Sequence, residues 1–274
     1  MKLALSMWSM HRTVRKEGWT ALDFLEHCRR EGIDRVELLN VFWRDIDAEL
    51  PRVVEFARTN GIRVGSYAVA NDFVHGDPAE REAALRQITD AIPVALTLGT
   101  RTIRVFSGNL GEGFTFESAL GFIIDGLREA AAAAAAQGMT LCLENHGKLA
   151  GTGEQVRHIL ERVGSPALKS TFDTGNFLLV DEDPLDSLDV LLPQVAHVHV
   201  KDFAEDPEGR YVSLAGAKFE GVEAGKGLVR LDTIVERLQA GGYGGEFVLE
   251  YEGTGDEAEG IRASYAYFQT LIPN

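Results

Sequence analysis

The sequence predicts a single-domain (β/α)₈ barrel, the TIM-barrel fold, over residues 1–274. The first observation behind this prediction is a unit of helix, glycine and strand that recurs along the chain, as expected where a glycine caps each helix. The second is the regular alternation of strand and helix patterns, which implies parallel strands with helices on their faces. Eight such units in 274 residues favour a closed barrel, and no glycine-rich dinucleotide fingerprint follows the first strand.

The expected strands are short apolar runs, and no proline- or serine-rich linker separates any of them into a second domain. They cover residues 2–8, 34–39, 62–69, 101–107, 139–145, 168–174, 195–201 and 246–251. The glycines that close the preceding helical stretches are Gly32, Gly61, Gly99, Gly138 and Gly164.

The expected helices carry an apolar stripe with the spacing i, i+3, i+4, i+7, as in Leu120, Ile123, Ile124 and Leu127. Their starts are marked by capping residues, and Pro93 should kink or split the helix that contains it. The predicted caps are Thr20 with Asp23, Thr152 with Gln155, and the pairs Asp77-Pro78 and Asp183-Pro184.

The amino-acid composition limits which classes of binding partner and which cellular compartment are expected. The 42 acidic residues against 27 basic ones give a formal net charge of −15, which disfavours nucleic acid or an anionic membrane as a partner. Cys28 and Cys142 form no disulfide framework, as is typical of a reducing compartment. No secretion signal is recognised, and no apolar run approaches the roughly 20 residues of a membrane span. We therefore expect a cytoplasmic protein that binds neither nucleic acid nor membrane.

The segment 195–202, Val-Ala-His-Val-His-Val-Lys-Asp, alternates with the two-residue period of a strand. This period places His197, His199 and Lys201 on one face, and the intervening valines on the other. Polar side chains on one face of a strand usually face water. In a barrel that closes around its strands, the same face can instead point inward.

Three further strands bring a carboxylate to their carboxyl ends, where the functional site of such a barrel lies. Glu144, Asp173 and Glu250, together with His199, would form an oxygen-rich site with one nitrogen ligand. A single acidic residue there is usually a helix cap, but four candidate ligands on consecutive strands indicate a metal. We predict one divalent ion, with Mn²⁺ first and Mg²⁺, Co²⁺ or Zn²⁺ as alternatives.

Several motifs resemble the xylose-isomerase-like TIM-barrel superfamily, which includes sugar phosphate isomerases and epimerases. They are Leu143-Glu-Asn-His146, Phe172-Asp-Thr-Gly-Asn176, His197-Val-His-Val-Lys-Asp202 and Phe247-Val-Leu-Glu-Tyr-Glu252, with a further likeness in Arg104-Val-Phe-Ser-Gly108. The resemblance covers nearly the whole chain, and the metal ligands of the family fall on Glu144, Asp173, His199 and Glu250.

The resemblance implies an enzyme that isomerises or epimerises a sugar or cyclitol, with or without a phosphate group. Its reaction would be proton transfer through a metal-bound enediolate, with Glu144 and Glu250 as the catalytic residues. Return of the proton to the same carbon from the opposite face gives epimerisation. Return to the neighbouring carbon gives aldose–ketose isomerisation.

Other polar and aromatic residues near the strand ends are expected to contact the substrate. They are His146, Asn176, His197, Lys201, Trp8 and Phe106. For His197 a hydrogen-bonded structural role is about as well supported, and large aromatic side chains such as Trp8 more often belong to the core.

Alternatives remain within the same superfamily. One is a dehydratase or lyase of the inosose or dehydroshikimate type, and another is a sugar-binding or partner subunit of a C-glycoside-cleaving complex. Asn176 and Glu205 stand where ketose 3-epimerases carry His and Arg, which speaks against that activity. The Asp-X-His motif of apurinic endonucleases is absent from the sequence. A homo-oligomer is compatible with the sequence.

Overall fold

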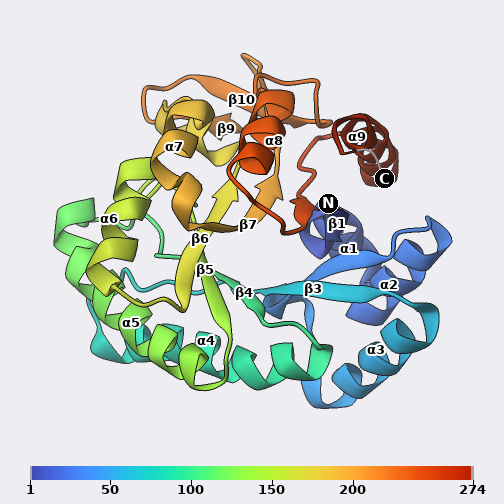
Figure 1. Ribbon diagram of the computed structural model, residues 1–274, viewed down its shortest axis with the longest axis horizontal. Helices are drawn as coiled ribbons and strands as arrows, with labels where there is room; N and C mark the ends of the chain where they lie inside the picture. Colours follow the sequence, from blue (N-terminus) through green and yellow to red (C-terminus); the bar gives the residue numbers. More distant parts are fainter. Residues whose placement is uncertain (1, 273–274) are drawn as a thin grey trace.

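The protein, represented by a computed structural model that describes residues 2–272, is a closed barrel of parallel strands (Figure 1). The predicted fold is confirmed. The barrel strands are β1 (Leu3–Ser6), β2 (Arg35–Leu39), β3 (Arg63–Ala68), β4 (Thr102–Val105), β5 (Thr140–Glu144), β6 (Leu168–Asp173), β7 (Val195–Val200) and β11 (Phe247–Leu249). They follow chain order around the ring, and β11 closes it by pairing in parallel with both β7 and β1. The expected extent of the domain, residues 1–274, reaches beyond the described residues and stays a prediction.

The helices form the outer layer around the barrel (Figure 1), and most of them bury an apolar stripe. They are α1 (His11–Glu17), α2 (Ala21–Arg30), α3 (Ile46–Asn60), α4 (Pro78–Leu98), α5 (Phe116–Ala136), α6 (Gly153–Val163), α7 (Pro184–Leu191), α8 (Leu231–Ala240) and α9 (Glu257–Leu271). Helix α5 contacts the core through Ile123, Ile124 and Leu127, as its periodicity predicts. At Gly126 a Cβ atom would lie 2.4 Å from the ring of Phe73, so only glycine permits this close approach.

The predicted helix ends are also present. Thr20 and Thr152 each form a reciprocal capping box with the residue three positions later. Asp77 and Asp183 each cap a helix whose first residue is proline. The predicted closing glycines all have left-handed φ values: Gly32, Gly61, Gly99, Gly138 and Gly164.

The sequence predicts that Pro93 kinks or splits its helix, and the helix is not split. Helix α4 continues through it from Pro78 to Leu98. Proline removes one backbone hydrogen bond from a helix. The apolar face stays buried on both sides, at Ala91, Ile92 and Ala95, and this packing outweighs the single missing bond.

The strands are shorter than predicted, and this matters at the carboxyl ends. β1 ends at Ser6 and continues into the 3₁₀ turn η1 (Met7–Met10). β11 ends at Leu249, so Glu250 lies one residue beyond it. Side chains at such positions can reach over the open end of the barrel.

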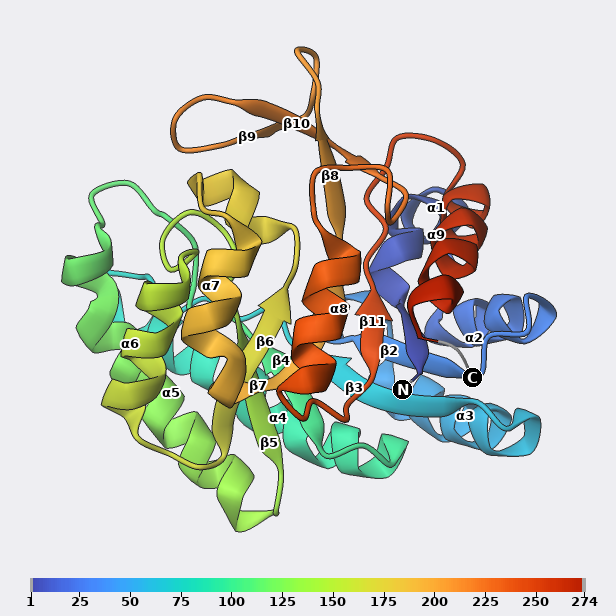
Figure 2. The ribbon, with the colours of Figure 1, turned by 45° about the horizontal axis from the view of Figure 1, so that its top comes forward.

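A small antiparallel sheet follows β7, and it was not predicted from the sequence. It consists of β8 (Asp202–Glu205), β9 (Tyr211–Val212) and β10 (Lys218–Val222), and it projects beyond the barrel in Figure 2. The loop after β9 is anchored to the segment after β6, because the Leu214 N–H donates to the Leu179 carbonyl at 3.1 Å. The sheet therefore reaches over part of the carboxyl-terminal face of the barrel.

Residues 2–272 contain no helix with both the length and the apolar character that crossing a bilayer requires.

Candidate metal centre and substrate cavity

Four side chains from four neighbouring strands meet at the carboxyl-terminal end of the barrel. Glu144 ends β5, Asp173 ends β6, His199 lies in β7, and Glu250 follows β11. One donor atom from each lies within 4.8 Å of the others. All four are at most 4% exposed. These are the four residues that the sequence indicates as metal ligands.

Strand register explains why they meet. Asp173 of β6 pairs directly with His199 of β7, so their side chains point to the same side of the sheet. The side chain of Asn145 then holds the end of β6 in place. Its Oδ1 accepts from the Asp173 N–H at 2.8 Å, and its Nδ2 donates to the Asp173 carbonyl at 3.0 Å.

Three of the four residues present a buried atom that lacks a hydrogen-bond partner within the described part of the chain. These atoms are Glu144 Oε2, Asp173 Oδ2 and His199 Nδ1. His199 Nδ1 lies 3.3 Å from Glu144 Oε2 and 3.4 Å from Glu250 Oε1, in poor hydrogen-bond geometry. Unsatisfied buried polar atoms are costly. Three of them pointing at one spot fit a cation, and three carboxylates with one imidazole are a ligand set that divalent ions accept.

Two buried cations flank this cluster on opposite sides. Arg104 Nε lies 3.1 Å from Glu144 Oε2. Lys201 Nζ lies 3.2 Å from Asp173 Oδ2 and 3.3 Å from Glu250 Oε2. Each cation offsets part of the repulsion among the carboxylates.

Burial and neighbouring charges set the protonation of the cluster. Burial alone would raise the pKa of Glu144 and Glu250, but the charge on His199 and the flanking cations outweigh it and lower both pKa values. For Asp173, burial and the two glutamates prevail over Lys201 and raise its pKa to about 6. Burial opposes the charged form of His199, yet the surrounding carboxylates raise its pKa well above the usual value. Glu144 and Glu250 are thus held as carboxylates.

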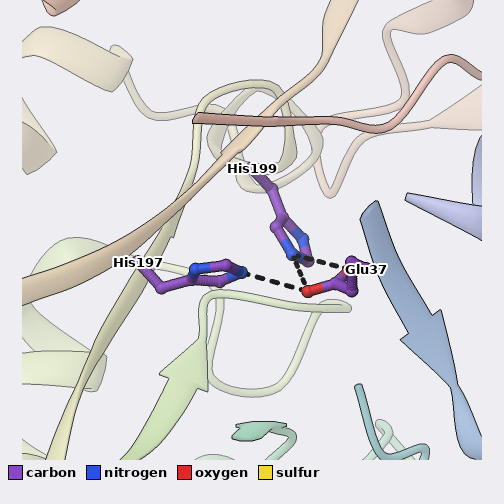
Figure 3. A group of neighbouring side chains, drawn as sticks. All are labelled: Glu37, His197 and His199. Atoms are coloured by element: carbon purple, nitrogen blue, oxygen red, sulfur yellow. Dashed lines mark hydrogen bonds and ion pairs between the residues drawn. The ribbon is translucent and has the colours of Figure 1, made fainter. Parts of the chain in front are cut away.

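A further carboxylate, that of Glu37, contacts the other nitrogen of the His199 ring. Figure 3 shows the carboxylate of Glu37, from β2, in contact with the rings of both His197 and His199. His199 Nε2 lies 3.2 Å from Glu37 Oε1, and His197 Nε2 lies 3.1 Å from Glu37 Oε2. Burial would raise the pKa of Glu37, but the charge on His199 and the contacts with both rings hold it well below its usual value.

A cavity of about 440 Å³ opens beside the cluster, and Glu144 and Glu250 form part of its wall. Five of the six predicted substrate residues also line it: Trp8, Phe106, His146, Asn176 and Lys201. The rings of Phe106 and His146 stack with centroids 4.0 Å apart. Asn176 Nδ2 donates to Glu144 Oε1 at 3.0 Å, so this amide touches both the cavity and a candidate ligand.

His197, the sixth predicted substrate residue, is placed differently. Its ring contacts Glu37 below the cluster, and it lines a separate hollow with Ala196 and Gly245, away from the 440 Å³ cavity. The structural alternative considered for His197 therefore accounts for its observed contacts.

Glu252 organises the mouth of the cavity. It accepts hydrogen bonds from Trp8 Nε1 at 3.0 Å and from the Tyr211 hydroxyl. Lys201 Nζ lies 2.9 Å from Glu252 Oε1. The carboxylate thus connects the end of β1, the end of β7 and the antiparallel sheet. Arg15, whose guanidinium lies 5.2 Å from the Trp8 ring centroid, also lines this mouth.

Four residues of the site, Glu37, Arg104, Tyr211 and Glu252, received no role from the sequence. A usable signal existed for two of them, because Glu37 and Arg104 are charged residues in the interior of otherwise apolar strands. Such residues are rarely buried unless they are paired. Tyr211 lies in a two-residue strand, for which no periodicity can be detected.

The fold and this cluster together define a TIM barrel with a candidate divalent-metal centre at the carboxyl ends of its strands. The chain belongs to the family of xylose isomerase-like TIM barrels, whose family model matches residues 25–271.

Among curated proteins, an inosose dehydratase of Geobacillus thermodenitrificans (strain NG80-2) is 28% identical over 137 residues, which is 47% of this chain and 46% of the relative. An inosose dehydratase of Bacillus anthracis is 31% identical over 140 residues, again 47% of this chain and 46% of the relative. The match spans about half the length of these curated relatives.

Solved structures are similar over nearly the whole chain. A probable 3-DHS dehydratase, AsbF, involved in petrobactin synthesis from Bacillus anthracis, superposes with a TM-score of 0.78 at 19% identity, covering 98% of this chain and 99% of the other. The IolI protein with a binding zinc atom has a TM-score of 0.78 at 17% identity, covering 99% and 98%. The 3-keto-D-glucoside 4-epimerase YcjR from E. coli has a TM-score of 0.76 at 16% identity, covering 98% and 99%. At these identities the likeness concerns the fold.

Proposed function

We propose that this protein is a divalent-metal-dependent isomerase or epimerase of a sugar or cyclitol. In this proposal Glu144 and Glu250 exchange a proton with a substrate carbon next to a carbonyl group. The observation that carries the proposal is the placement of these two carboxylates. They approach the same nitrogen of His199 from different strands, at 3.3 and 3.4 Å, and both line one cavity.

Glu144, Asp173, His199 and Glu250 would hold the metal, because their donor atoms converge and three of them have a buried atom without a hydrogen-bond partner among the described residues. When bound, a divalent ion supplies Lewis-acid stabilisation of negative charge on the oxygens of the substrate. The zinc atom in the structurally similar IolI protein supports a divalent ion in this fold. By ligand type, Mn²⁺ is the first expectation.

The chain itself would supply the acid and the base. One glutamate, as a carboxylate, takes the proton from the C–H bond, and the electron pair moves into the adjacent carbonyl to form an enediolate. The other glutamate, after taking up a proton from water, returns that proton to carbon, and the two residues end with exchanged protonation states. Arg104 beside Glu144 and Lys201 beside Glu250 favour the ionised form of each base.

The cavity wall suits a small polyhydroxylated ring. Asn176 and Lys201 offer donors to hydroxyl or carbonyl oxygens, and Trp8 and Phe106 offer apolar faces to C–H groups. His146 contributes an imidazole that burial keeps neutral by lowering its pKa. The same groups serve a ring with or without a phosphate.

A second candidate is a dehydratase of the inosose type, which the identity to named inosose dehydratases favours. Both candidates begin with removal of a proton next to a carbonyl. A dehydratase would then expel a neighbouring hydroxyl group as water, whereas an isomerase or epimerase would return the proton to carbon.

One experiment separates these reactions. The manganese-loaded protein is incubated in D₂O with a panel of ketoses, 3-keto sugars and inososes, and the products are followed by NMR and ultraviolet absorbance. Isomerisation or epimerisation should place deuterium on the reacting carbon without new absorbance. Dehydration should release water and create an absorbing unsaturated ketone. A rearranged product that carries no deuterium would indicate a hydride shift and would contradict the proposed roles of Glu144 and Glu250.

A further inference from the structure

Glu37 is a fully buried carboxylate whose two oxygens both have hydrogen-bond partners. Ser6 Oγ donates to Oε1 at 3.0 Å, and Ser66 Oγ donates to Oε2 at 2.7 Å. His197 Nε2 lies 3.1 Å from Oε2, and His199 Nε2 lies 3.2 Å from Oε1. Contacts from β1, β3 and β7 therefore fix this carboxylate from several sides.

The two nitrogens of the His199 ring face different groups. Nε2 faces Glu37, whose carboxylate can only accept from it. Nδ1 faces Glu144 and Glu250 and has no hydrogen-bond partner among residues 2–272. With Nε2–H donating to Glu37, the lone pair of the neutral ring resides on Nδ1.

We propose that Glu37 is a positioning residue that orients His199 so that Nδ1 becomes the nitrogen available to the metal. A ligating histidine commonly donates its other ring N–H to a carboxylate, which fixes the ring and increases its basicity. This inference rests on the proposed metal site but not on the proposed reaction. It assigns Glu37 no contact with substrate.

The geometry opposes a second metal at Glu37, His197 and His199, although their donor atoms are also close enough to share an ion. Neither oxygen of Glu37 is short of a partner, and two serine hydroxyl groups already donate to it. By contrast, the cluster around Glu144 presents three atoms that have no hydrogen-bond partner in the described part of the chain. The difference places the cation on the Nδ1 side of the ring.

The first test measures zinc affinity by competition with a chelator. Glu37→Gln keeps the size of the side chain but removes the charged acceptor, and it should weaken zinc binding about 10–100-fold. Ser66→Ala is the matched control, because it removes another hydrogen bond to Glu37 and leaves its charge beside His199. This control should keep most of the wild-type affinity. Folded Glu37→Gln protein with wild-type affinity would overturn the inference, as would an equal loss in Ser66→Ala.

The second test uses the wild-type protein and does not depend on how a variant folds. In zinc-loaded protein labelled with ¹⁵N-histidine, His199 should show a coordinated Nδ1 and a slowly exchanging Nε2–H. Coordination through Nε2 would overturn the proposed role of Glu37. Failure of the wild-type protein to bind zinc at all would instead defeat the metal site on which this inference rests.

Discussion

The two halves of the barrel contribute to the site in different ways. Strands β5, β6 and β7, together with the residue after β11, supply one candidate ligand each, and three of these ligands retain a buried atom without a hydrogen-bond partner among the described residues. Strands β1 to β4 supply supporting residues instead: Ser6, Glu37, Ser66 and Arg104. One half thus presents the candidate ligands, and the other half, together with Lys201, holds their charges in place.

This difference shows how a barrel interior can carry ionised groups. A buried carboxylate without compensation is strongly unfavourable. Here each candidate ligand has a cation or a hydrogen-bond donor or acceptor beside it, such as Arg104 beside Glu144 and Glu37 beside His199. The centre itself is left for a cation.

The largest expected effect lies in the ligating half. Glu250→Gln and Glu144→Gln each keep an oxygen near the centre but remove a proton acceptor. We expect each to slow turnover about 10²–10⁴-fold, with a smaller loss of metal affinity. The two losses should not add in the double variant, because both residues serve one intermediate. Steady-state kinetics and metal titration measure both quantities.

The control for these variants is Glu236→Gln, an exposed glutamate on α8. It should behave like the wild type. Full turnover in either Glu144→Gln or Glu250→Gln would show that the base is another residue of the cavity, with Lys201 the next to test.

The half formed by β1 to β4 should stabilise the protein by compensating the charge of the candidate ligands. Arg104→Met leaves Glu144 without its buried guanidinium, and loss of one partner from a buried pair costs about 3–5 kcal/mol. The cost should be smaller in metal-loaded protein, because the ion then compensates Glu144. Urea unfolding with and without metal measures this difference.

An exposed pair provides the comparison for Arg104. Arg128 and Asp125 lie 3.2 Å apart, with side chains 52% and 81% exposed. Arg128→Met should therefore change the free energy of unfolding by no more than about 1 kcal/mol. An equal effect of metal on both variants would contradict the supporting role of Arg104.

Metal removal should lower the stability of the protein, because the bound ion compensates the charge of its ligands. Saturation at a metal concentration about 100 times the dissociation constant should stabilise the protein by about 2.7 kcal/mol. Thermal unfolding before and after treatment with a chelator measures this gain. In Asp173→Asn the gain should be largely lost. A full gain in that variant would place the ion elsewhere.

The antiparallel sheet should have a moderate effect. Tyr211→Phe removes one hydrogen-bond donor to Glu252. This carboxylate keeps its hydrogen bond from Trp8 and its ion pair with Lys201. We expect kcat/KM to fall about fivefold, which corresponds to a loss of about 1 kcal/mol in transition-state stabilisation. A loss as large as that of Glu250→Gln would instead place the Tyr211 hydroxyl in the chemistry.

The smallest expected effect lies outside the site. Burial lowers the pKa of His27 on α2 below its usual value of 6.5. The unfolded chain therefore binds more protons as the pH falls through about 6.5, so this contribution to stability is present above that pH and is lost below it. His27→Gln should show a weaker decline in the free energy of unfolding between about pH 7.5 and about pH 5.5. An unchanged decline would assign the pH dependence to other groups.

The ligating half could be recognised from the sequence because its signals are local. Each candidate ligand lies at the end of an apolar run, and a period of two places His199 on the inward face of its strand. Alternating strands and helices, capping residues and closing glycines likewise depend on neighbours within a few positions. For this reason the sequence alone determined the barrel, most helix ends and the set Glu144, Asp173, His199 and Glu250.

Only the tertiary structure decided which residues support that set. Glu37 contacts His199 across 162 positions of the chain, and Glu252 contacts Trp8 across 244. It also decided that His197 faces Glu37, although its strand period is the same as that of His199, because the two residues lie at different depths in the barrel. The antiparallel sheet was missed because no helix separates its strands, so the alternation of strand and helix that marked the barrel is absent there. Contacts between distant segments depend on barrel closure, and no local pattern encodes the depth at which a side chain will lie.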